Sequence, residues 1–423
     1  MAALSHLVII LFILNGSSIS AEPSRQFIIT KYGAIADGKT LNTESIQRTI
    51  NAAASAGGGT VVIRGGTFLS GAMFLKPGVH LELEKDAVLE GSTDIRDYPK
   101  MKTRIEGALK EWVPALINAD KADHVRITGG GTLDGNGAPF WKEFWDRRRA
   151  DPKTTNLDVP RPRLMLIQNS RDVLISGIHF RNSGFWNLHL YRCVDVRVEN
   201  ATFEAPNNQP PDRAPSSDGI DIDSCQRVTI SGCTFAVGDD CVCLKGSKGP
   251  FAMRDKDSPP TEHIHVTRCI FKTGHGVVTL GSEATVVRDV AVDDCRVMDS
   301  VPLVRIKVRP DTPQHFEDIS FRNIALSGDG PMFDVRRWTQ FFDLQGQPPP
   351  RSVVSGITVS DVHGSFGAFG EIVGNPETTI TEIILRNINV TLKNPKLKLG
   401  DVKNLRVENV NVNGRSFSPE TER

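Results

Sequence analysis

The sequence has no excess of charge of either sign, because 50 Lys and Arg residues balance 50 Asp and Glu residues over 423 positions. No overall field therefore selects an anionic or a cationic partner, and a polyanionic ligand would have to meet a local basic patch. We expect no nucleic-acid partner. The seven cysteines also include no C-x-x-C pair, which argues against a zinc site.

Long apolar runs are scarce. One run, at residues 7–14 (LVIILFIL), is too short to span a bilayer and is followed by small residues. This pattern predicts a signal peptide over residues 1–20, cleaved near Ser20 or Ala21, although no Lys or Arg precedes the run. The alternative is a buried N-terminal strand, which the polar segment 20–26 disfavours. We therefore expect a secreted protein, extracellular or periplasmic, with no membrane segment.

A pattern of alternating residues recurs between positions 170 and 412. Two examples are CVDVRVENATF from Cys193 and CQRVTISGCTF from Cys225, in which apolar residues hold the fourth and sixth places. Alternation with period two indicates β-strands. The repeats begin 22 to 38 residues apart, and a constant core with variable spacing is typical of stacked coils whose loops take insertions on one face.

A second short strand, such as NLHLY or GIDID, precedes most of these repeats. Two or three short strands per coil predict an all-β fold, a single-stranded right-handed parallel β-helix (a solenoid) whose coils stack about 4.8 Å apart. A leucine-rich-repeat solenoid is the alternative, but the sequence has neither the Leu framework nor the helical return that it needs. No linker interrupts the chain, so we expect residues 21–423 to form one domain.

A helix near the N-terminus is expected to cap the solenoid. The segment NTESIQRTINAAASAGGG places Ile46, Ile50 and Ala53 on one helical face, with Asn42 or Thr43 as the N-cap and glycines at the end. Because the core of a solenoid is open at its ends, an apolar helical face is needed there to cover it.

Five of the seven cysteines recur at two places of the repeat. Stacked coils would arrange them in ladders, and three interpretations of such ladders are disulfide bonds, a metal site and packing in the core. We favour core packing by a small apolar residue, because a ladder repeats one core position. Cys193 and Cys225 hold the first place, and Cys233, Cys269 and Cys295 hold the ninth.

Charged residues gather in four short segments, SSDGID, GDDC, GHG and RIK. If Ile220 pairs with Val242, the coil register puts Asp218 beside Asp240, and the other two segments fall on the next two coils. Four coils at this spacing bring all four segments within about 15 Å. The residues that stack in this way are Asp218, Asp239, Asp240, His275, Arg305 and Lys307.

A single Asp at the start of a strand is usually a turn residue. Two carboxylates one coil apart are different, because at about 4 Å and an effective dielectric near 20 they repel by ~4 kcal/mol, or about 3 pKa units. A hydrolase uses such a pair, with one carboxyl held protonated as acid and another ionised as base. Glycoside hydrolysis needs this arrangement. We therefore interpret the cluster as catalytic.

The four segments resemble, in the same order, the signature segments of glycoside hydrolase family 28, the polygalacturonase-like enzymes. The resemblance covers nearly all of residues 27–412. It implies an inverting hydrolase of α-linked galacturonic-acid-containing polysaccharide, that is pectin, with no cofactor and no metal. By the same resemblance Asp239 is the general acid, Asp218 and Asp240 activate water, and His275 supports the acid.

The resemblance also implies a substrate-binding set. Arg305 and Lys307 match side chains that bind the substrate carboxylate. Ser216 and Ser217 stand where the family usually has Asn-Thr, so we expect Ser217 to bind substrate through an altered hydrogen bond. Asp221 is interpreted as a supporting residue.

Two long basic segments, 139–163 and 245–260, are expected to be loops at the rim of the cleft. Loops that block one end of a cleft favour exo action on a chain. Trp141, Trp145 and Trp186 could stack on sugar faces, and ordinary loop packing is equally open.

Other functions stay open at this point. A rhamnogalacturonan hydrolase of the same family is one, and a pectate-lyase-like, calcium-dependent eliminase is another. A lyase needs an acidic Ca²⁺ cluster and a basic residue rather than paired acid and base carboxyls. A carbohydrate-binding solenoid without activity is the third. We expect a monomer in each case.

Overall fold

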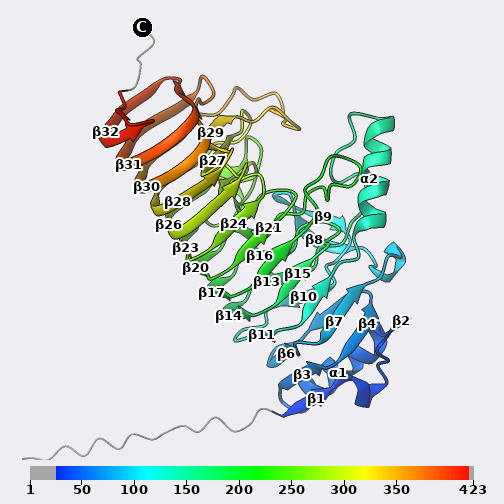
Figure 1. The fold of residues 1–423 in the computed structure, drawn as a ribbon. Helices are drawn as coiled ribbons and strands as arrows, with labels where there is room; N and C mark the ends of the chain where they lie inside the picture. Colours follow the sequence, from blue (N-terminus) through cyan, green and yellow to red (C-terminus); the bar gives the residue numbers. More distant parts are fainter. Residues whose placement is uncertain (1–24, 419–423) are drawn as a thin grey trace, which may run out of the picture.

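Short strands stack in parallel along one axis and form a long β-helix in the computed structural model, which describes residues 25–418 (Figure 1). One continuous 31-stranded sheet runs through the described residues. The predicted parallel β-helix is therefore confirmed. The predicted signal peptide, residues 1–20, lies outside the described residues. No helix of residues 25–418 is long and apolar enough to cross a membrane.

Each central coil contributes one strand to each of three stacks. The first stack carries the short strands that precede the repeats: β5 (Met73–Leu75), β10 (Ile117–Asp120), β13 (Met165–Gln168), β16 (Leu188–Tyr191), β19 (Ile220–Asp223), β22 (Val242–Lys245), β25 (Val278–Leu280), β27 (Val304–Val308) and β29 (Pro331–Arg337). The second comprises β1 (Gln26–Ile28), β3 (Gly59–Ile63), β6 (Val79–Leu83), β11 (Arg126–Gly129), β14 (Arg171–Ser176), β17 (Val194–Glu199), β20 (Gln226–Ser231) and β23 (Thr261–Thr267). The third comprises β2 (Asp37–Leu41), β4 (Gly66–Ser70), β7 (Ala87–Gly91), β12 (Thr132–Asp134), β15 (His179–Arg181), β18 (Thr202–Glu204), β21 (Thr234–Ala236) and β24 (Ile270–Thr273).

Towards the C-terminus the second and third stacks merge into long strands, drawn in yellow to red in Figure 1, and from residue 352 onward the first stack joins them. An antiparallel pairing of the last two strands, β32 with β33, ends the sheet. The merged strands and the closing strand are β26 (Val286–Asp299), β28 (His315–Gly328), β30 (Ser352–Ile372), β31 (Thr378–Leu399), β32 (Val402–Val412) and β33 (Arg415–Ser416).

Sharp corners at fixed places of the repeat separate the strands of a coil. The eighth place of the repeat has a positive φ throughout, as at Asn200 (52°), Gly232 (65°) and Asn387 (51°). This left-handed conformation suits Gly and is tolerated by Asn and Asp, which explains their recurrence there. One such residue turns the chain without a loop, so the apolar places of successive coils stay in register.

The interior is filled by ladders of identical residues. Phe180, Phe203, Phe235 and Phe271 are fully buried, and their ring centroids stack 4.7 to 5.1 Å apart at interplanar angles of 5° to 14°. The seven cysteines are all buried and free, which confirms the core-packing interpretation over disulfides. In these four coils each phenylalanine thus meets the ring of its neighbour, and Phe203 and Phe235 are packed by a ring on both sides.

The predicted capping helix is α1 (Thr43–Ser55), which lies over the first coils with Ile46, Ile50 and Ala53 buried. The expected side-chain cap is wrong. The side-chain oxygen of Asn42 instead bonds the loop before the helix, where it accepts from the backbone N–H of Ile35 at 2.7 Å. The Thr43 hydroxyl accepts from the Gly71 amide at 2.7 Å, which ties the helix to a neighbouring coil rather than to its own first turn.

Two insertions stand on the side of the first stack (Figure 1). One is the antiparallel hairpin β8 (Met101–Ile105) and β9 (Ala108–Trp112). The other is helix α2 (Ala138–Ala150), within a segment expected to be loop throughout. It forms because Phe140, Trp141 and Phe144 recur at helical spacing and bury one face. Three short 3₁₀ turns complete the structure: η1 (Ile29–Tyr32), η2 (Ile95–Asp97) and η3 (Ala252–Arg254).

The phenylalanine ladder gives a test of the fold. Phe235→Ala should lower the free energy of unfolding by about 3–5 kcal/mol, because it removes a ring that is packed on both faces and leaves a cavity in the core. Phe251→Ala, at an exposed aromatic (43%), should change it by less than about 0.5 kcal/mol. Denaturant unfolding measures both, and equal small effects would contradict the ladder packing.

Candidate active site

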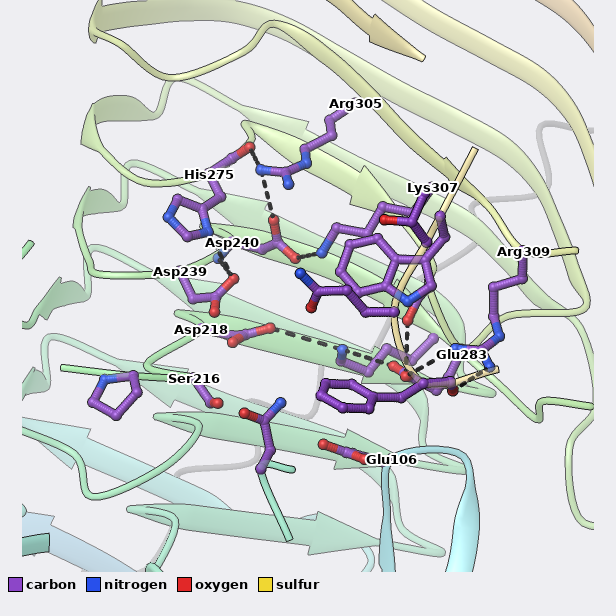
Figure 2. Close-up of a pocket in the computed structure, with 18 of the residues that line it drawn as sticks. Glu106, Ser216, Asp218, Asp239, Asp240, His275, Glu283, Arg305, Lys307 and Arg309 are labelled. Atoms are coloured by element: carbon purple, nitrogen blue, oxygen red, sulfur yellow. Dashed lines mark hydrogen bonds and ion pairs between the residues drawn. The ribbon is translucent and has the colours of Figure 1, made fainter. Parts of the chain in front are cut away.

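The charged residues predicted to stack do so at the edge of the first stack. Ile220 pairs with Val242, Val242 with Val278, and Val278 with Val304, which is the predicted register over four coils. Figure 2 shows the resulting column of side chains above the strands. They line a cleft of about 670 Å³. The members of the column are Asp218, Asp239, Asp240, His275, Arg305 and Lys307.

Asp240 lies at the centre of this column and is almost fully buried. Lys307 Nζ donates to its Oδ2 at 2.5 Å, and Thr279 Oγ1 donates to its Oδ1 at 2.8 Å. Arg305 Nη1 lies 3.7 Å from the same Oδ1. Burial raises the pKa of Asp240, but the charges of Lys307 and Arg305 outweigh it, so the pKa lies below its ordinary value. Asp240 is therefore an ionised carboxylate at neutral pH.

Asp239 is more accessible, with 26% of its side chain exposed to the cleft. Its Oδ1 lies 3.1 Å from Nδ1 of His275. Burial raises the pKa of Asp239, but His275, Lys307 and Arg213 together lower it below its ordinary value. In the substrate-free protein this carboxyl is ionised and faces open space.

The two glycines of the GHG segment place His275. A Cβ on Gly276 would lie 2.4 Å from Thr279 Oγ1 and 3.0 Å from Arg305 Cδ, so no larger residue fits there. The His275 carbonyl also accepts from Arg305 Nη1. Gly276 therefore lets two coils approach closely enough for Arg305 to reach the backbone beside the imidazole.

Asp218 is buried on the other side of Asp239, with its Oδ2 3.7 Å from Lys245 Nζ. Behind it Asp221 is fully buried, makes no carboxylate hydrogen bond and lies 3.4 Å from the same ammonium. Burial and the negative charges of Asp221 and Asp239 raise the pKa of Asp218 well above its usual range. Burial likewise raises the pKa of Asp221, to about 7. Asp218 and Asp221 therefore keep their protons at pH values at which Asp239 and Asp240 are ionised.

Lys245 was not predicted, although it ends β22, the strand that directly follows GDDC. Its Nζ contacts Asp218, Asp221 and, at 3.5 Å, Glu283, and it lies 4.7 Å from the centroid of the Trp186 ring. The sequence did offer a signal for it: Lys245 ends the strand that follows Asp240, and that strand belongs to the stack that carries the charged column. Glu106 had no such signal, because the β8–β9 hairpin brings it to the cleft from far earlier in the chain.

Ser217 does not reach the cleft, in contrast to its predicted role in substrate binding. It is fully buried, and its hydroxyl donates to the Ala214 carbonyl at 2.9 Å and accepts from the Gly238 amide at 3.0 Å. Its hydrogen bonds thus join two coils beneath Asp239. Ser216, with a positive φ of 54°, lines the cleft in its place.

The aromatic residues of the rim divide between cleft and core. Trp145 lines the cleft and is half-buried. Trp186 borders the cleft but is buried, with 3% exposed, and Trp141 is also buried and donates to the Ser183 carbonyl at 2.8 Å. Trp338 also lines the cleft, and Lys307 Nζ lies 5.1 Å from its ring centroid. Among the described residues, sugar stacking therefore has two candidate indole rings with exposed surface, those of Trp145 and Trp338.

Ligand atoms of Asp218, Asp240 and Cys243 lie within 4.8 Å of one another, which is close enough to share a metal ion. The surrounding groups do not fit Ca²⁺. Lys307 Nζ already bonds Asp240, Lys245 lies beside Asp218, and a cysteine sulfur is a poor ligand for a cation that prefers six to eight oxygens. A calcium ion here would have to displace two buried ammonium groups.

The fold and this column of residues agree with a known family. A family model described as "Glycosyl hydrolases family 28" matches residues 79–416. The chain belongs to this family. It is therefore a glycoside hydrolase of the polygalacturonase-like group.

Relatives of this family-28 chain are distant. A protein described as probable polygalacturonase, from Vitis vinifera, is 28% identical over 397 residues, covering 90% of this chain and 77% of the relative. An exopolygalacturonase of Zea mays is 28% identical over 377 residues, covering 85% and 79%. The crystal structure of an exopolygalacturonase from Thermotoga maritima has a TM-score of 0.79 at 24% identity and covers 93% of both chains, which shows the shared fold.

The raised pKa of Asp221 gives a stability test. Its ordinary pKa near 3.9 in the unfolded chain and about 7 in the folded protein mean that wild type loses stability as pH rises from about 4 to 7. Asp221→Asn does not titrate, so its stability relative to wild type should rise over this window by up to about 4 kcal/mol. Denaturant unfolding at several pH values measures this difference. Asp401→Asn, at an exposed site, should show no such trend, and a flat difference for Asp221→Asn would contradict the assignment.

Proposed function

We propose that this protein hydrolyses α-linked galacturonic-acid chains of pectin with inversion, from a chain end. One observation carries the proposal: three carboxyl groups on adjacent coils meet at a cleft with a surplus of positive charge. The descriptions of relatives in Vitis vinifera and Zea mays as polygalacturonase and exopolygalacturonase support the same substrate.

The cleft is positive although the whole chain is neutral. Nine Arg or Lys side chains line it against six Asp or Glu side chains, an excess of three positive charges. A partly enclosed cleft concentrates such a field and attracts a polyanion such as polygalacturonate. The cations are Arg148, Arg213, Lys245, Lys248, Arg305, Lys307, Arg309, Arg336 and Arg337, and the acids are Glu106, Asp218, Asp239, Asp240, Glu283 and Asp334.

In the proposed reaction Asp239 gives a proton to the glycosidic oxygen as the bond from that oxygen to the anomeric carbon breaks. A water held by Asp218 and Asp240 attacks the opposite face of the sugar and gives its proton to Asp240. Lys307 keeps Asp240 ionised for this role. Product release and proton exchange with solvent restore both carboxyls.

Asp239 is ionised in the free protein, so the acid must form when substrate binds. Lys307 is one of the groups that lower the Asp239 pKa. A substrate carboxylate bound to Arg305 and Lys307 adds a negative charge beside it, which raises the pKa of Asp239. Substrate thus supplies the charge that lets Asp239 hold the catalytic proton. A neutral sugar at the same place would leave Asp239 ionised.

The proposed exo action rests on the walls of the cleft. The β8–β9 hairpin contributes Glu106, helix α2 contributes Phe144, and the segment 337–341 contributes Phe341. Arg104 holds the hairpin by a buried pair with Asp223 at 2.9 Å, so this wall is fixed. We propose that these walls close one end of the cleft, so that a polysaccharide chain enters by its end.

We also propose that the protein is secreted, which agrees with the proposed substrate. The apolar run at residues 7–14, followed by small residues, supports export, and a cell-wall polysaccharide is met outside the cytoplasm.

The acid assignment is tested at Asp239. Asp239→Asn should lower kcat on polygalacturonate by about 10²–10⁴-fold, because general acid catalysis contributes that much, while substrate binding remains. Reducing-sugar release measures the rate, and calorimetry on the variant measures binding. Asp120→Asn, at an exposed carboxylate outside the cleft, is the control. Unaltered turnover in Asp239→Asn would refute the assignment.

Substrate and products separate hydrolysis from the alternatives. We expect faster reducing-sugar release from polygalacturonate than from rhamnogalacturonan, small products from the first turnovers, and no effect of EDTA. Size-resolved products and ultraviolet absorbance are the readouts. A mixture of mid-sized oligomers would refute exo action. Loss of activity with EDTA, or products that absorb as unsaturated uronides, would favour the calcium-dependent eliminase.

A further inference from the structure

Arg213 occupies a place in the cleft that no signature segment of the sequence includes. It lies in the loop between β18 and β19, lines the cleft and is half-buried. Trp145 Nε1 of helix α2 donates to its carbonyl at 2.7 Å. Its own Nε and Nη2 donate to the Gly238 carbonyl at 3.1 and 2.9 Å. The side chain is thus held at both its backbone and its guanidinium.

The same guanidinium contacts the imidazole of the active site. Nη2 of Arg213 is closest to Nε2 of His275 and lies 3.4 Å from Nδ1, while Nδ1 lies closer to Oδ1 of Asp239, at 3.1 Å. A guanidinium has five N–H donors and no acceptor, and a carboxylate only accepts. Nε2 must therefore present its lone pair to Arg213, and the ring proton must lie on Nδ1, where it is donated to Asp239. The other tautomer would place an N–H against a donor and a lone pair against a carboxylate.

We propose that Arg213 is a positioning residue that fixes His275 as the neutral Nδ1–H tautomer, and so fixes the hydrogen bond from His275 to Asp239. The charged groups around this imidazole fit the assignment. Asp239 takes the Nδ1 proton, Arg305 bonds the His275 carbonyl, and Asp240 lies in the next shell with Lys307 on its far oxygen. Among residues 25–418 no carboxylate forms an ion pair with Arg213. Its nearest side-chain partner is the His275 ring, and its charge also helps to lower the pKa of Asp239.

A neutral His275 matters for the proposed reaction, on which the kinetic part of this inference rests. An imidazolium would add a second positive charge beside Asp239 and hold it ionised when it must carry the catalytic proton. Neutral His275 can orient the carboxyl with one hydrogen bond and add no charge. Asp239, with its side chain partly exposed, has few other contacts that would orient it: its Oδ1 also accepts from the Asp240 amide at 3.0 Å.

The tautomer can be observed directly. Imidazole ¹⁵N chemical shifts in the ¹⁵N-histidine-labelled full chain distinguish a protonated from an unprotonated ring nitrogen, and His275→Asn identifies the signals among the 10 histidines. We expect Nδ1 protonated and Nε2 unprotonated in wild type, and a mixture of tautomers in Arg213→Gln. Nε2–H in wild type would overturn the proposal even if the Gln variant failed to fold. So would an unchanged pure Nδ1–H state in Arg213→Gln.

Kinetics then separate positioning from general loss of charge. Arg213→Gln should lower kcat on polygalacturonate about 10–100-fold with little change in KM, the effect of one charge-assisted hydrogen bond. Arg213→Lys keeps a donor-only cation at the ring and should restore the tautomer and part of kcat. Arg149→Gln removes an exposed cation of helix α2 that does not line the cleft and should match wild type. A KM effect alone, or Lys no better than Gln, would overturn the positioning role.

These readouts fail separately from the proposed function. If wild type releases no sugar from any pectic chain while Nδ1–H is observed and lost in Arg213→Gln, the proposed function is refuted and the Arg213–His275 contact stands. If wild type is active but the tautomer is Nε2–H, the function stands and the Arg213 role is refuted.

Discussion

The in-register stacking of parallel coils is the constraint on which the rest of this structure depends. Backbone hydrogen bonds hold β19, β22, β25 and β27 one coil apart, and the side chains at corresponding places must follow. Phenylalanines and cysteines that repeat in this way stack and bury. Charged residues that repeat in this way are forced together regardless of their mutual repulsion. The active site is the charged counterpart of the core ladders.

Because stacking forces these carboxyl groups close together, their neighbours divide them into groups with a lowered pKa and groups with a raised pKa. Asp240, next to Lys307, has a lowered pKa, whereas Asp218, next to Asp221 and Asp239, has a raised one. Burial raises the pKa of both groups. For Asp240 the cations Lys307 and Arg305 outweigh burial, whereas for Asp218 the acids Asp221 and Asp239 add to it. Protons in such a cluster belong to the group rather than to one residue. A substrate carboxylate changes this balance by binding among the cations, so binding and proton transfer are coupled through charge.

The sequence was informative where periodicity governs the structure. The register of Ile220 with Val242 followed from the repeat alone, and it brought Asp218, Asp240 and His275 together correctly. Features that depend on loop paths were missed or misjudged. Helix α2, Glu106 on its hairpin and Arg213 are placed by tertiary contacts that no repeat encodes. Ser217 sits at the right place in the chain, but its hydroxyl bonds inward to Ala214 and Gly238.

The position of the catalytic coils along the rod has a consequence for how the molecule opens. The backbone of each coil pairs only with its two neighbours, so we expect local unfolding to begin at the ends and to advance coil by coil. Helix α1 covers one end and the β32–β33 hairpin closes the other, with several coils between each end and β19–β27. Fraying at either terminus therefore has to melt those intervening coils before it reaches the cleft. The outer coils therefore keep the catalytic geometry intact while the ends of the solenoid unfold and refold locally.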